Sequence, residues 1–189
     1  MWTDRRWGGR WLDRLFQLIL LLSLGLNVIL ANQLQAVTSR FDNLLAATAF
    51  GVGTPAAPFE AHEGDGNLIS LDFGGPRPVL LYMVSATCRA TALNRARAAD
   101  LVAQLRDRVD VYFVALDSEE SIADELGVPE GVRLLHRPTP QTTVSFKLGA
   151  TPHTLYVQDG IIKGGWVGTY VSGNARHMSA VLGVTLATR

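Results

Sequence analysis

Cys88 is the residue of this chain whose type and setting best suit it to chemistry. It follows the apolar run 79–84 and opens a stretch with helical spacing. A thiol at a helix start meets unpaired N–H groups and the positive end of the macrodipole, which favour the thiolate. Arg89 adds a nearby cation, and the Thr91 hydroxyl, three residues on, can reach back to the sulfur. We therefore expect Cys88 to be a nucleophile, with Thr91 and Arg89 as modulators.

The absence of a second cysteine limits what this nucleophile can do. The 189 residues contain one cysteine, which excludes an internal disulfide, a four-cysteine zinc site and a CxxC pair. Attack on a substrate disulfide would stop at a mixed disulfide until an external thiol resolved it. The sequence thus predicts monothiol exchange. The alternative is that Cys88 is a small buried residue with a structural role only.

The elements that must position Cys88 have an α/β pattern. Strand-like apolar runs at 79–84, 109–116 and 132–136 alternate with helical patterns at 89–106 and 118–126. Such alternation requires crossover helices, a parallel core and right-handed connections. In the first of these helices, we expect the buried side to carry Leu93, Ala96, Leu101 and Leu105.

The pattern changes on either side of this unit. Residues 151–157 and 161–170 flank a Gln-Asp-Gly turn and predict a hairpin, followed by a last helix at 172–182. Near the other end, Phe59 and residues 68–72 predict short edge strands. The fold class is therefore α/β, with a central mixed sheet in which a βαβ unit precedes a β-hairpin and a final helix.

The N-terminal region predicts a membrane anchor. No charged residue occurs from Leu15 to Ser39, and about 20 apolar residues suffice to cross the hydrocarbon core. Basic residues concentrate before this run, which places the N-terminus in the cytoplasm; they are Arg5, Arg6, Arg10 and Arg14. Trp2, Trp7 and Trp11 would lie near the headgroups.

These features give four segments. We predict a cytoplasmic basic segment at 1–14, a single transmembrane anchor at 15–35, a tether at 36–50 and a folded domain at 51–189. The domain would then lie outside the cell inner membrane, in the periplasm or its equivalent. A signal peptide cleaved at Ala31 or Ala36 is the competing interpretation, and a buried core helix is a third.

Three stretches together resemble the thioredoxin-like superfamily. Residues 78–88 resemble the central strand that delivers the redox cysteine to a helix, residues 150–154 resemble the segment with a cis-proline, and residues 51–59 with 67–72 resemble the entrance hairpin of the membrane-anchored members. The resemblance is to the TlpA-like and redoxin branch, which includes the alkyl hydroperoxide reductase and thiol-specific antioxidant proteins. It implies a thioredoxin-like fold over about 51–185 and oxidoreductase activity.

The same resemblance assigns a substrate-binding element and marks this chain as a single-cysteine variant. It implies that Pro152 is cis and faces Cys88, and that Thr151, Pro152 and His153 form the docking segment; a proline that merely starts a strand is the other interpretation. Thr91 stands where the family has its resolving cysteine. Ser85 stands where a peroxidase has threonine, so a single-cysteine peroxidase stays an alternative, as does a non-catalytic binding or scaffold module.

The composition limits the kinds of partner that we expect this protein to bind. The 17 basic and 17 acidic residues balance, and no basic patch with interleaved aromatics follows the anchor, so we expect no nucleic-acid partner. His62, His136 and His177 lack metal-ligand spacing, and we expect neither a metal nor a cofactor. The expected partner is an extracytoplasmic protein thiol or disulfide, or an external thiol reductant.

Overall fold

The structure is a computed structural model that describes residues 8–49, 51–117 and 126–186. The chain divides into two compact units, residues 1–40 and 41–189.

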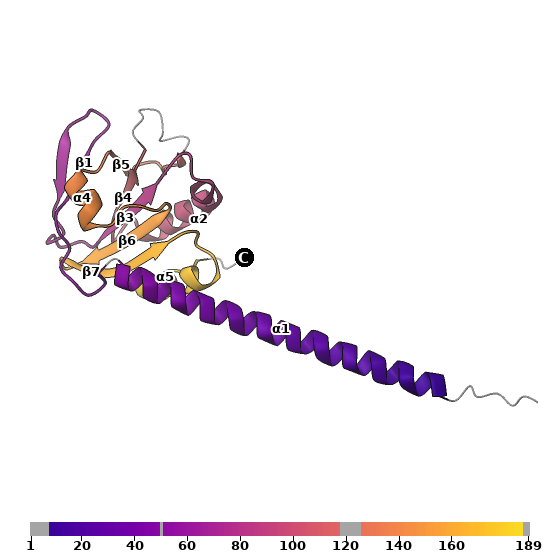
Figure 1. Ribbon diagram of the computed structural model, residues 1–189. Coiled ribbons are helices and arrows are strands. Elements are labelled where there is room, and N and C mark those ends of the chain that lie inside the picture. The colour runs from indigo at the N-terminus through magenta and orange to yellow at the C-terminus, as the bar shows by residue number, and fades with distance from the viewer. Residues whose placement is uncertain (1–7, 50, 118–125, 187–189) are drawn as a thin grey trace, which may run out of the picture. The chain divides into compact units, whose positions relative to one another are not determined.

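The described residues of the N-terminal unit all lie in one long helix, α1 (Gly8–Ala49) (Figure 1). Its segment Asp13–Gln35 spans 23 residues with a mean hydropathy of 2.0 and is not buried, so it has the length and composition to cross a membrane. An N-terminal signal sequence shares these properties. The predicted apolar helix is thus confirmed, whereas Trp2, Trp7, Arg5 and Arg6 lie outside the described residues.

The segment predicted as a tether is helical up to Ala49. Residues 36–49 contain no glycine or proline, and alanine and leucine supply much of the stretch. These residue types favour the helix and nothing in them ends it before Gly51. The small and polar composition alone therefore did not indicate an irregular linker.

The C-terminal unit is built on a mixed sheet that contains seven strands among the described residues, in the order β2-β1-β5-β4-β3-β6-β7. The strands are β1 (Phe59–His62), β2 (Leu68–Leu71), β3 (Val79–Val84), β4 (Asp110–Ala115), β5 (Arg133–His136), β6 (His153–Gln158) and β7 (Ile161–Val167). The central strands β3, β4 and β5 are parallel, and the others pair antiparallel. The predicted parallel core and hairpin are confirmed, and residues 68–71 form an edge strand as predicted. The strand at Phe59 is not an edge strand, because β1 pairs with β2 on one side and with β5 on the other.

Three helices are described around the sheet: α2 (Arg89–Leu105), α4 (Pro140–Ser145) and α5 (Ser172–Leu182) (Figure 1). Helix α4 is short and begins after the N-cap residue Thr139, whose hydroxyl accepts a hydrogen bond from the N–H of Thr142. The sequence analysis did not predict this helix. The helix predicted at 118–126 falls almost wholly outside the described residues.

Strand β3 is buried along its whole length because both faces of the sheet are covered. Leu80, Tyr82 and Val84 pack with residues of α2 and α5. Leu81 and Met83 pack on the opposite face, with β1 and the residues after α4. The strand that leads to Cys88 is thus fixed from both sides.

The buried face of α2 differs from the predicted one. Leu101 and Leu105 are buried as expected, but Leu93 is 62% exposed and Ala96 is exposed. The positions that replace them in the interior are Thr91 and Asn94, beside Ala98 and Val102. A pattern based on apolar residues missed this face because two of its positions are polar residues.

Candidate active site

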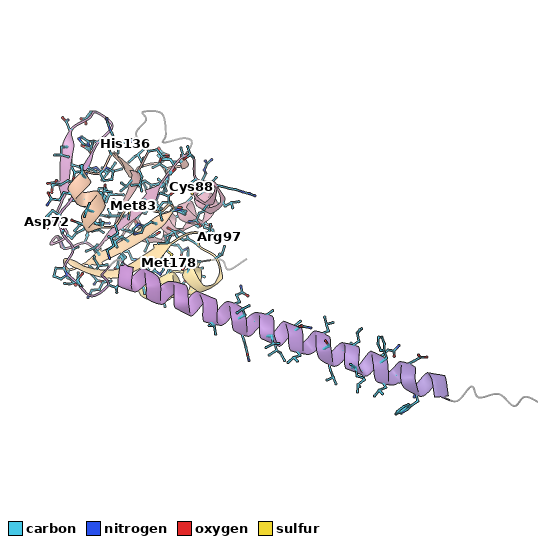
Figure 2. The ribbon with its side chains drawn as sticks, in the orientation of Figure 1. Asp72, Met83, Cys88, Arg97, His136 and Met178 are labelled. Carbon is cyan, nitrogen blue, oxygen red and sulfur yellow. The ribbon has the colours of Figure 1, made fainter. Side chains whose placement is uncertain are left out.

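Cys88 lies at the N-cap position of α2, with extended backbone angles (φ −84°, ψ 114°). Its carbonyl accepts the first helical bond, from the N–H of Ala92 at 3.2 Å, and its own N–H donates to the Ser85 carbonyl at 3.2 Å. The residue is partly exposed. Figure 2 shows Cys88 beside α2, and Met83 of the preceding strand β3 is fully buried. The strand-to-helix placement predicted for this thiol is confirmed.

The loop before β6 faces the thiol. The Thr151–Pro152 peptide bond is cis, and the Cys88 thiol donates to the Thr151 carbonyl oxygen at 3.2 Å. The Pro152 carbonyl accepts from the N–H of Gly168 at 2.7 Å, which ties this loop to the residues after β7. The structure therefore brings together Cys88, Thr151 and Pro152, as the sequence resemblance implied.

Hydrogen bonds to the sulfur lower the pKa of Cys88. The Thr151 side chain contributes most, partial burial opposes it, and the backbone and hydroxyl of Thr91 and the backbone of Ala90 add to the lowering. These donors favour the thiolate, whereas the Thr151 carbonyl accepts only from the thiol. Cys88 therefore ionises more readily than an ordinary cysteine.

The Thr91 hydroxyl is buried and also lowers the pKa of Cys88. Thr91 is 3% exposed, and its hydroxyl has no hydrogen-bond partner of good geometry within the described ranges, although it lowers the pKa of Cys88. A buried hydroxyl without a full partner is costly. Ionisation of Cys88 would supply the acceptor that this donor lacks, which supports the predicted modulating role of Thr91.

Two other predicted site residues lie apart from this cluster. Arg89 is exposed, and the groups that lower the pKa of Cys88 do not include it. His153 is 1% exposed and pairs with Met83, whose side chain packs on the face of the sheet away from α2. Its burial removes His153 from the exposed surface that a docked substrate would contact.

Burial also lowers the pKa of His153 to about 3. Between pH 6.5 and that value, the unfolded chain binds a proton that the folded chain does not, so stability falls as the pH falls. We expect the free energy of unfolding to drop by about 2 kcal/mol from pH 7 to pH 5 through this residue. Urea unfolding of the full-length protein in mild detergent measures it.

His153→Leu should remove most of this pH dependence because it keeps an apolar volume and deletes the titrating group. His136→Leu should remove a smaller part, since burial and then Arg137 lower the pKa of His136 in the same direction. An unchanged slope in His153→Leu would contradict the assignment.

Sequence reasoning missed a buried polar network behind the site. Its members are Tyr82 of β3, Asn94 of α2, Thr154 of β6 and Tyr170 before α5, each at most 3% exposed. A tyrosine within an otherwise aliphatic strand and an asparagine on the inner side of α2 were the signals available.

The comparisons with known proteins identify the fold. No family model and no curated protein matches the chain. Among solved structures, the thioredoxin domain of a thiol-disulfide oxidoreductase from Bacteroides vulgatus matches with a TM-score of 0.55 at 18% identity, over 69% of this chain and 97% of that one. A putative thiol:disulfide interchange protein DsbE from Chlorobium tepidum matches with a TM-score of 0.56 at 18% identity, over 69% and 97%.

A third match is a secreted Mycobacterium tuberculosis disulfide oxidoreductase described as homologous to Escherichia coli DsbE. Its TM-score is 0.52 at 12% identity, over 66% of this chain and 94% of that one. These likenesses, the sheet order and the cysteine facing a cis-proline show that the C-terminal unit has the thioredoxin-like fold.

Proposed function

We propose that this protein is a membrane-anchored, extracytoplasmic thiol-disulfide exchange protein that works through Cys88 alone. The observation that carries the proposal is the placement of a partly exposed thiol at the start of α2, with a lowered pKa and the Thr151–Pro152 segment in contact with it. A purely structural cysteine needs none of these features. The similar solved structures are described as the thioredoxin domain of a thiol-disulfide oxidoreductase and as a putative thiol:disulfide interchange protein, which supports the same chemistry here.

The proposed reaction has two balanced steps. The Cys88 thiolate attacks one sulfur of a substrate disulfide, forms a mixed disulfide with it and releases the other sulfur as a thiolate, which takes a proton from water. An external thiolate then attacks the substrate sulfur of that mixed disulfide. This second step regenerates the Cys88 thiolate and leaves the substrate as a new disulfide with the external thiol.

The binding and location parts of the proposal follow from the same segments. Thr151 and Pro152 would receive the substrate beside the sulfur, and Arg89, exposed next to Cys88, would meet acidic groups of a partner. The apolar segment of α1 would hold the domain at the inner membrane, with residues 1–14 in the cytoplasm. The partner would be an extracytoplasmic protein thiol or disulfide, or an external thiol reductant.

The direct test is the reaction of the full-length protein in mild detergent with glutathione disulfide. We expect one glutathione per chain by intact mass, its removal by excess thiol, and a rate that rises with pH to a midpoint below the ~8.5 of a free cysteine. A protein that forms the adduct only after unfolding would contradict the proposal. In that case the scaffold interpretation would replace it.

A further inference from the structure

The polar network behind Cys88 links every element that forms the site. The Asn94 side-chain amide donates to the Tyr82 hydroxyl at 2.9 Å, and its carbonyl oxygen accepts from the N–H of Tyr170 at 2.8 Å. The Tyr170 and Thr154 hydroxyls share a hydrogen bond of 2.6 Å. The chain of contacts therefore runs from β3 through α2 to the residues before α5, and from there to β6.

This route joins the two sides of the site without touching the sulfur. Asn94 lies on the helix that begins after Cys88, whereas Thr154 follows Pro152 by two residues. On the same loop, the Pro152 carbonyl accepts from Gly168, two residues before Tyr170. The segment from Gly168 to Tyr170 thus contacts α2, β6 and the loop that carries Thr151.

The four residues of this network are almost completely shielded from water. Asn94 and Thr154 are 0% exposed, Tyr170 is 1% and Tyr82 is 2%. Buried polar groups rigidify a site when each has its partner and are costly when one is lost. A broken bond in this network would therefore be relieved by movement of the elements that it joins.

We propose that Tyr170 and Thr154 are positioning residues for Cys88, which set the placement of the Thr151 loop against the sulfur through their shared hydrogen bond. The proposal deepens the exchange function proposed above and rests on it for its biological use. It assigns to the network a role in the reactivity of the thiol beyond its contribution to stability.

The electrostatics of the network agree with this role. Burial raises the pKa of Tyr82 to about 12, with Asn94 opposing it and the negative charge of Cys88 adding to it. Burial also raises the pKa of Tyr170 well above its usual value. Both phenols therefore stay neutral over the pH range in which Cys88 titrates.

The test is the pH dependence of Cys88 alkylation by iodoacetamide in the full-length protein. Tyr170→Phe and Thr154→Val each delete one hydroxyl of the shared bond while keeping the shape of the side chain. We expect both to raise the midpoint of the alkylation curve by about half a pH unit, because the Thr151 donor is held less closely. Thr154→Ser, which keeps the hydroxyl, should restore the wild-type midpoint.

Tyr156→Phe is the matched control. Tyr156 lies on β6, and its hydroxyl donates to Gln158 at 3.2 Å, outside the network; its removal should leave the midpoint unchanged. The proposal is overturned if Tyr170→Phe and Thr154→Val lower the unfolding temperature but keep the wild-type curve. The glutathione disulfide reaction of the wild type is scored separately, so a failure of the exchange function and a failure of the positioning role give different results.

Discussion

Replacing Cys88 by serine is expected to abolish reaction with glutathione disulfide completely. The chain has no second cysteine that could substitute, and a serine hydroxyl does not ionise near neutral pH or form a disulfide. The expected loss is therefore to the background of the reagent rather than a partial decrease. Intact-mass analysis of the full-length protein in mild detergent measures it.

The same substitution separates the exchange function from the scaffold alternative in cells. Mixed disulfides between the wild-type protein and its partners, trapped by acid quenching, should be absent in Cys88→Ser. Cys88→Ala serves as the control for the change in polarity when serine replaces cysteine. Both variants should unfold at nearly the wild-type temperature because Cys88 is only partly buried. If the variants keep full biological activity, the domain binds its partner without chemistry and the exchange proposal fails.

The sequence predicted the thiol and its facing loop because local signals mark both. An unbroken apolar run at 79–84, four residues before Cys88, indicates a covered central strand, and the Thr151–Pro152 pair lies just before another strand. Both features are local in the chain, and the fold brings them together through the pairing of β3 with β6. That pairing is long-range, and here it was the family resemblance that supplied it.

The sequence did not predict which residues of α2 face the core, because two of them, Thr91 and Asn94, are polar. Asn94 is buried only because Tyr82 and Tyr170 satisfy its amide, and these partners come from two distant parts of the chain. An apolar pattern instead favoured Leu93, which is exposed. Likewise, the resemblance assigned His153 to the docking segment because of its place beside Pro152, whereas strand alternation turns its side chain into the interior.

Thr151→Val is expected to raise the pKa of Cys88 more than any other single hydroxyl deletion at the site. The Thr151 side chain is the largest cause of the lowered pKa, and the Thr91 hydroxyl is a smaller one. Valine keeps the size of threonine and leaves the backbone carbonyl in place, so only the donor to the thiolate is lost. We expect a rise of about one unit for Thr151→Val and less for Thr91→Val.

Whether Thr151→Val slows or speeds the alkylation of Cys88 depends on the pH. This pH dependence distinguishes the loss of a thiolate donor from a general disruption of the site. Well below the pKa, a one-unit rise cuts the thiolate fraction about tenfold, while the more basic thiolate is about threefold more nucleophilic. The net alkylation rate near neutral pH should therefore fall about threefold, and at high pH Thr151→Val should react faster than the wild type.

Thr87→Val is the matched control, since the hydroxyl of Thr87 bonds Ser85 at 3.0 Å and is not among the groups that lower the pKa of Cys88. Curves for Thr151→Val that stay below the wild type at every pH would mean that the substitution blocks access to the sulfur, and the assignment of Thr151 as a thiolate donor would be wrong.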